Sequence, residues 1–92
     1  MNITDIRIRQ TYHENRLLAL VSITVDYDLA VHDIKVIRGP DRLFVAMPSR
    51  EDEKGVFRDI VHPINSQARM LLEEKILEAY QRSLAYNHKG KH

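Results

Sequence analysis

The segment 17–27 alternates in polarity at every second residue, which is the pattern of a β-strand with one buried face. One face of this strand carries Leu17, Ala19, Val21, Ile23, Val25 and Tyr27. Leu18 and Leu20 add apolar side chains to the opposite face, near the start of the strand. Because a strand this long needs neighbours on both sides and a layer over its apolar face, the chain must build a sheet.

Four other segments show strand patterns of the same kind and flank this one along the chain. The predicted strands are Ile3–Arg9, Leu29–Ile37, Leu43–Met47 and Val56–Val61. Pro48 ends the fourth of them, and Pro63 ends the fifth because the residue before a proline prefers extended geometry. The sequence therefore predicts five short strands in close succession.

Turn residues separate the predicted strands. Asn15 follows the first and is suited to the left-handed conformation of a hairpin turn. Turns are also expected at residues 26–28 and at Gly39–Arg42, where Pro40 presets φ. The segment Ser49–Gly55 is wholly polar, so we expect it to project into solvent as a loop.

One amphipathic helix is predicted over about Gln67–Leu84, preceded by Asn65 and Ser66 as possible N-cap residues. Its apolar stripe consists of Ala68, Leu72, Ile76, Ala79, Tyr80 and Leu84, widened by Met70, Leu71 and Leu77. Glu78 and Arg82 are spaced to pair on the exposed side. Residues 1–85 then form one domain, and residues 86–92 a flexible basic tail.

The expected fold is α+β: an antiparallel five-stranded meander followed by a C-terminal helix packed on one face of the sheet. A chain of 92 residues has a thin core, so a partner subunit would add to its stability. The apolar side chains of Leu18 and Leu20 exceed what a sheet wetted on one face needs. We therefore expect a homodimer built through the sheet.

Charge and composition exclude several classes of protein. Lys and Arg number 14 and Asp and Glu 13, a net charge of +1, so any anionic partner must meet a local patch. The chain has no cysteine, which excludes disulfides and thiolate zinc sites and fits a cytoplasmic protein. The N-terminus lacks the pattern of a signal peptide, and no apolar run is long enough for a membrane span.

Candidate catalytic and metal-binding residues are few. Asp59, His62 and Ser66 are residue types of a catalytic triad, but their spacing along a strand and its exit does not suit one. His88 and His92 are four residues apart but have no third ligand. We expect no enzyme activity, metal, cofactor or small-molecule substrate. Histidines 32 and 62 are interpreted as hydrogen-bonding residues, and Tyr80 and Phe57 as core residues rather than base-stacking ones.

Basic residues offer the clearest candidate interface. A phosphate-binding surface, doubled by a dimer axis, would comprise Arg50, Lys54, Arg58, Arg69, Lys75 and Arg82. Acidic residues dilute it in two places: residues 51–53 in the loop, and Glu73, Glu74 and Glu78 on the helix. The alternative is a protein-interaction module that uses a sheet edge or the exposed helix face.

Three phrases in the chain resemble the stage V sporulation protein G (SpoVG) family. They are Val31–Ile37, the Phe-Val-Ala-Met-Pro-Ser phrase at 44–49, and the Phe-Arg-Asp-Ile-x-His-Pro-Ile-Asn-Ser phrase at 57–66. Residues 3–9 and 19–26 are similar to the same family, so the resemblance covers about residues 3–80. Such long phrases are specific.

The resemblance implies a small dimeric bacterial regulator, associated with septation and sporulation, that binds DNA and in some members RNA. It implies no enzyme activity. The family usually has a Lys-Arg pair after Met-Pro-Ser, followed by Thr-Pro-Asp-Gly. Here Arg50 keeps the first basic position and Glu51 replaces the second, which weakens the expected anion binding at this loop.

Overall fold

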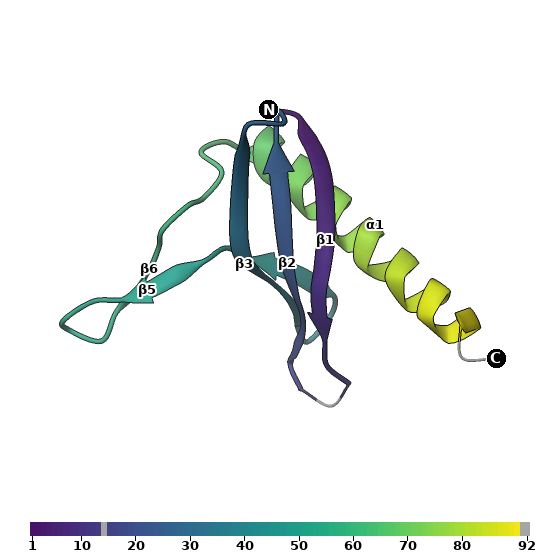
Figure 1. Cartoon of the computed structure of the whole chain (residues 1–92). Helices are drawn as coiled ribbons and strands as arrows, with labels where there is room; N and C mark the ends of the chain where they lie inside the picture. Colours follow the sequence, from purple (N-terminus) through teal and green to yellow (C-terminus); the bar gives the residue numbers. More distant parts are fainter. Residues whose placement is uncertain (14, 91–92) are drawn as a thin grey trace.

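The computed structural model describes residues 1–13 and 15–90, the last five by their backbone alone, and shows a sheet crossed on one face by a long helix (Figure 1). The sheet contains β1 (Ile3–Thr11), β2 (Leu17–Val25), β3 (Leu29–Arg38) and β4 (Leu43–Ala46), antiparallel and adjacent in chain order. β5 (Ser49–Glu51), β6 (Phe57–Asp59) and α1 (Ser66–Gly90) follow. The predicted α+β class, with one C-terminal helix on an antiparallel sheet, is confirmed.

The predicted single meander of five strands is wrong. β5 and β6 pair only with each other, in a two-stranded ribbon that projects from the body (Figure 1). Continuing the β3–β4 register would place Pro48, which has no N–H, opposite Asp33, where β3 has a φ of 63°. The ladder therefore stops, and the expected loop 49–55 begins with a strand. We call residues 49–59 the arm, and β1–β4 with α1 the body.

The core lies between the sheet and α1. Cross-strand neighbours share a face of the sheet, and the row of Ile8, Val21 and Ile34 faces the helix. The helix contributes Leu72, Ile76 and Tyr80, as the apolar stripe predicts. The buried apolar set consists of Leu18, Ala19, Val21, Ile23, Val31, Ile34, Val36, Val45, Met47, Leu72, Ile76 and Tyr80. Each such aliphatic side chain contributes about 1.5–3 kcal/mol when fully buried.

Two of the predicted turns are confirmed. Asp26 and Tyr27 both have positive φ, 53° and 60°, and the Asp28 N–H donates to the Val25 carbonyl oxygen at 3.0 Å. This is the geometry of a two-residue hairpin turn that matches the twist of its strands. At the second turn, a side chain on Gly39 would lie 2.7 Å from the Arg42 carbonyl oxygen, so the position has no room for one. The left-handed conformation expected at Asn15 stays a prediction.

The helix begins where its cap predicts and extends further than its pattern predicts. Asn65 Oδ1 accepts the backbone N–H of Ala68 at 2.7 Å, so Asn65 is the N-cap. The predicted pair of Glu78 and Arg82 is formed. The backbone stays helical to Gly90, six residues past the predicted end at Leu84. The flexible basic tail over 86–92 stays a prediction, with residues 91–92 outside the described part of the chain.

The two edges of the four-stranded sheet differ. At β4, Glu73 of α1 reaches the strand, and its Oε2 accepts the Val45 backbone N–H at 3.5 Å. Its Oε1 lies 3.7 Å from Arg42 Nη2. At β1 the strand is irregular, with register shifts at Thr4 and Arg9. One edge is thus covered by a helix side chain, and the other is interrupted by bulges.

Candidate nucleic-acid interface

The arm is a tight hairpin organised by one aspartate. Asp52 Oδ1 accepts the backbone N–H groups of Lys54 and Val56, at 2.8 and 3.0 Å, and its Oδ2 accepts Arg58 Nε–H at 3.0 Å. Gly55 has a φ of 80°, the left-handed position that closes a three-residue loop. These hydrogen bonds, above all those from Val56 and Arg58, hold the pKa of Asp52 below its ordinary value. Asp52 is therefore a structural element of the turn.

The arm pairs two arginines directly across its strands. Arg50 lies opposite Arg58, whereas Glu51 lies opposite Phe57 and Ser49 opposite Asp59. Because side chains alternate along a strand, the arginines share one face of the ribbon and Glu51 and Asp59 the other. Like charges placed directly opposite each other destabilise a strand pair, so this arrangement favours a bound anion.

The neutralisation of this arginine face is incomplete. Asp52 forms an ion pair with Arg58, and within residues 1–13 and 15–85 neither Arg50 nor Lys54 forms one. Acidic side chains nevertheless remain near, because the hollow of about 380 Å³ on the arm is lined by both arginines together with Glu51, Asp52, Glu53 and Asp59. The arm thus offers two positive charges to a partner against a mixed local background.

The structure divides the basic residues of the helix into two locations. Lys75 and Arg82 are two turns apart and line one groove beside residues 3–6 of β1, with Glu78 between them. Arg69 is in the first turns of α1, about 120° around the axis from Lys75. The arm projects on the side of the body opposite the C-terminal end of α1 (Figure 1). One chain therefore does not bring the six predicted residues into a single surface.

The other candidate residues have structural surroundings. His62 is exposed and its Nδ1 lies 3.2 Å from the Pro63 carbonyl oxygen. Tyr80 is buried in the core as predicted. Phe57 is 68% exposed, so its prediction as a core residue is wrong. The reason is that the arm leaves the body, and none of the side chains in residues 1–13 and 15–85 buries Phe57.

The described residues contain neither a cluster of metal-ligating side chains nor a helix suited to span a membrane. His88 and His92 lie outside the part of the chain whose side chains are described. Among the described side chains, no three metal-ligating groups lie together. No helix in residues 1–13 and 15–90 combines the length and apolar character that a membrane span requires.

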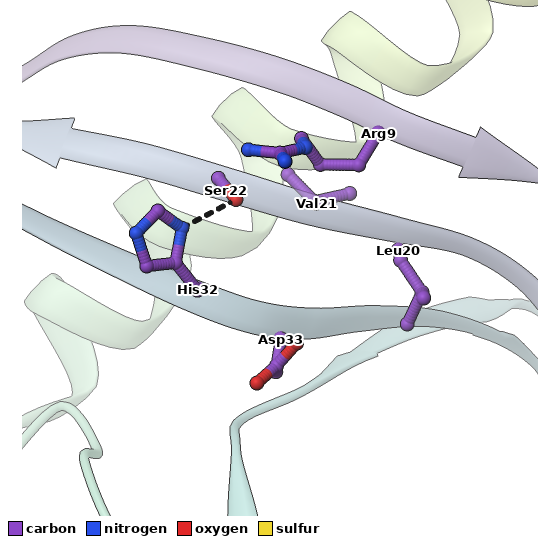
Figure 2. Close-up of a pocket in the computed structure, with 6 residues that line it drawn as sticks. All are labelled: Arg9, Leu20, Val21, Ser22, His32 and Asp33. Atoms are coloured by element: carbon purple, nitrogen blue, oxygen red, sulfur yellow. Dashed lines mark hydrogen bonds between the residues drawn. The ribbon is translucent and has the colours of Figure 1, made fainter.

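One polar site in the structure was not predicted from the sequence. It lies on the face of the sheet away from α1. There Ser22 Oγ lies 2.8 Å from His32 Nδ1, beside the Arg9 guanidinium (Figure 2). The hydrogen-bonding role predicted for His32 is confirmed. The signal in the sequence is the spacing of Val31, Ile34 and Val36, since the step of three residues marks an irregularity in an alternating strand.

Comparison with known proteins gives one consistent result. The model of the SpoVG family matches residues 1–82. A protein of Lachnospira eligens named "putative septation protein SpoVG" is 53% identical over 83 residues, covering 90% of this chain and 94% of its own. Proteins of the same name from Caldanaerobacter subterraneus and Clostridioides difficile are each 51% identical, covering 95% and 91% of this chain and 96% and 91% of their own. The resemblance inferred from the sequence is thus confirmed, and the chain belongs to the SpoVG family.

Proposed function

We propose that this protein is a homodimeric, non-enzymatic regulator of septation that acts in the cytoplasm by binding DNA, with RNA as the second candidate. The septation role is supported by the shared name of its relatives. The nucleic-acid role is supported above all by the Arg50–Arg58 pair on a projecting ribbon. A two-stranded β-ribbon is narrow enough to enter the major groove of DNA.

Phosphate contact from the arm follows from its charge arrangement. Because Arg58 is already paired with Asp52, an anion on this face would bind Arg50 and share Arg58 with Asp52 through charge-assisted hydrogen bonds. Lys54, at the apex of the hairpin loop, adds a third charge at the tip. Glu51 and Asp59 belong to the other ribbon face by the strand register, but they line the same hollow as the arginines and lower its positive potential. Asp52 supports the arm by holding Arg58 in place.

Helix residues Lys75 and Arg82 provide a second basic location, with Arg69 as a third. Because arm and helix groups are separated within one chain, we infer that they act together only in a dimer. The partner's arm would then extend the surface offered by one subunit's helix. This arrangement doubles each phosphate contact, as nucleic-acid-binding dimers commonly do.

The dimer is supported by uncovered apolar side chains on the arm and on the segment that follows it. Phe57, Ile60 and Ile64 expose 68%, 63% and 87% of their surface. Val56 and Val61 are also exposed. We expected the dimer through the sheet near Leu18 and Leu20; Leu18 is buried by its own chain, whereas Leu20 is partly exposed and lines the hollow on the outer face, so the sheet dimer stays a prediction. We propose, as a second candidate for the contact, these residues of the arm and of the segment that follows it, since such apolar clusters mark interfaces.

The nucleic-acid proposal is tested through salt and charge. Binding to duplex DNA should weaken with log K falling by about 0.9 per phosphate contacted for each tenfold rise in salt. Arg50→Glu combined with Arg58→Glu should reduce both the affinity and this slope. The matched control is Arg16→Glu combined with Arg7→Glu, the same charge change away from the arm. A salt-independent response, or equal losses in both variants, contradicts the proposal.

The dimer is tested by sedimentation at micromolar concentration. The wild type should sediment as a dimer, and Phe57→Ser with Ile64→Ser as a monomer. Met70→Ser, which alters an exposed apolar residue on the helix, is the control and should leave the dimer intact. A monomeric wild type rules the dimer out.

The alternative function is a protein-interaction module in cell division that uses a sheet edge or the helix face. The uncovered apolar side chains of the arm favour it as the second candidate. Charge reversal at Arg50, Lys54 and Arg58 separates the two functions. Nucleic-acid binding should be lost on reversal, whereas capture of a protein partner by apolar contacts or a strand edge should persist.

A further inference from the structure

Two β-bulges lie at the same level of the sheet, one on each side of β2. On β1, Arg9 is inserted between the paired positions Ile8 and Gln10. On β3, His32 and Asp33 both lie opposite Ser22. On the face away from α1, an open hollow of about 350 Å³ lies at this level. Bulges next to each other re-aim side chains, and here they direct Arg9 and His32 toward one point.

Polar groups converge at the floor of this hollow. Ser22 is 7% exposed, and among the described side chains it is the one polar group in the buried class. Its Oγ lies 2.8 Å from His32 Nδ1, which fixes the orientation of the imidazole. The Arg9 guanidinium extends over β2 toward this pair, while the Asp33 carboxylate points away from it (Figure 2). Leu20 forms an apolar wall.

Backbone strain accompanies the hollow. Asp33 has a φ of 63°, a conformation that costs a non-glycine residue on the order of 1 kcal/mol. It occurs inside β3, at a paired strand of the sheet, and not in a turn. Strain of this kind persists where the surrounding structure fixes it, and it occurs most often at binding sites.

The charged residues that line the hollow are Arg9 and Asp33, and Arg9 is the cation available to a ligand. Arg7, on the same face, is held by Asp5, with Nε and Oδ2 3.1 Å apart. Arg9 forms no ion pair with any of the residues 1–13 and 15–85. When the Ser22 hydroxyl donates to Nδ1, the neutral imidazole carries its proton on Nε2. Arg9, Ser22 and His32 line both this hollow and an adjoining one of about 200 Å³, and Nε2 lies on the side of the imidazole away from Ser22 and Leu20 (Figure 2).

We propose that this hollow, named the outer site and formed by Arg9, Ser22 and His32, binds a phosphate ester. Arg9 supplies the charge, His32 donates a hydrogen bond from Nε2, and Ser22 positions the imidazole. The apolar wall of Leu20 accommodates the carbon side of the ester. The outer site lies apart from the arm, so it goes beyond the proposed function and does not depend on it. The phosphate group has two sources, a free nucleotide or a nucleic-acid strand.

The test is a titration of ¹⁵N-labelled protein with adenosine monophosphate, and separately with a thymidine oligonucleotide that lacks terminal phosphates. We expect saturable shifts in the amides of residues 9, 22 and 32–33 in at least one titration. Shifts with the nucleotide alone assign the site to a free phosphate ester. Shifts with the oligonucleotide assign it to a strand. Absence of saturable shifts at these amides in both titrations overturns the proposal.

Variants make the test specific. Arg9→Gln and His32→Gln should each weaken binding about 10-fold or more, the effect of removing one charge-assisted hydrogen bond. Arg9→Lys should weaken it less, because the charge is kept. The matched control is Arg16→Gln, an exposed arginine that lines neither of the hollows lined by Arg9. If Arg16→Gln weakens binding as much as Arg9→Gln, the attraction is general and the outer site is ruled out. This test is independent of the arm. Its outcome stands even if the variants at Arg50 and Arg58 leave DNA binding unaffected.

Discussion

The body and the arm differ in what their side chains contact. Ile34, Val36 and Ile76 in the body expose 0% of their surface, whereas every residue of β5 and β6 is exposed. Burial links a side chain to stability, so the body's apolar sequence is explained by folding. The sequence of the arm, with its arginine pair and uncovered Phe57, is not explained by folding. The difference is why we assign the proposed contacts with other molecules to the arm.

The largest effect is expected in the body. Ile76→Ala should lower the free energy of unfolding by about 2–5 kcal/mol, because it removes a fully buried side chain and leaves a cavity. Urea unfolding measures this. Met70→Ala, on the same helix but 66% exposed, should change it by less than about 0.5 kcal/mol. Equal losses would mean that the helix does not pack as described.

An intermediate effect is expected where the segment after the arm enters α1. Asn65→Ala removes the acceptor of the Ala68 N–H and should cost about 1 kcal/mol in the free energy of unfolding. Ser66→Ala is the control, since Asn65 provides the cap, and should cost less. Thermal unfolding followed by circular dichroism compares the two. A larger loss from Ser66→Ala would assign the cap to Ser66.

A smaller and concentration-dependent effect is expected in the arm. Phe57→Ser should leave the free energy of unfolding within about 0.5 kcal/mol of wild type at the lowest protein concentrations. The loss should grow with concentration, because an interface stabilises only the associated protein. Unfolding curves over a range of concentrations show this. A large loss independent of concentration would place Phe57 in contact with its own chain.

The smallest effect on global stability is expected from acid acting on the arm. The pKa of Asp52 is lowered from 3.8, so its carboxylate stabilises the hairpin fully above that pH. This contribution is lost as the pH falls through the lowered pKa. Amide signals of residues 49–59 should therefore persist at pH 5 and change below pH 3.8. Asp52→Asn should abolish this pH dependence, and acid disorder starting near pH 5 would contradict the assignment.

The body could be predicted from the sequence because its patterns are periodic. Alternation located β1 to β4, and the spacing of Leu72, Ile76 and Tyr80 located the buried face of α1. In the arm, β6 lies inside the predicted strand Val56–Val61, but β5 was expected to be part of a loop, and its three polar residues show no apolar alternation. The pairing of β5 with β6 depends on the turn around Asp52. The side-chain hydrogen bonds of that turn exist only in three dimensions.

The candidate sites show the same division. Composition identified the basic residues, but only the strand register shows that Arg50 faces Arg58. The outer site combines β1, β2 and β3, so no local motif contains it. The SpoVG resemblance supplied the family and its general role, which local patterns alone do not carry.

Glu73 has a consequence for assembly. By accepting the Val45 N–H at 3.5 Å, it occupies one backbone donor on the β4 edge and hinders strand addition there, so β1 is the more open edge of the four-stranded sheet. A filament that grows by adding strands needs two free edges on every chain, one for each neighbour. A chain with one free edge can pair with only one other chain, so edge-to-edge addition stops at two chains. Replacing Glu73 would open the second edge, and the cost would appear as fibrous aggregation rather than as a lower melting temperature.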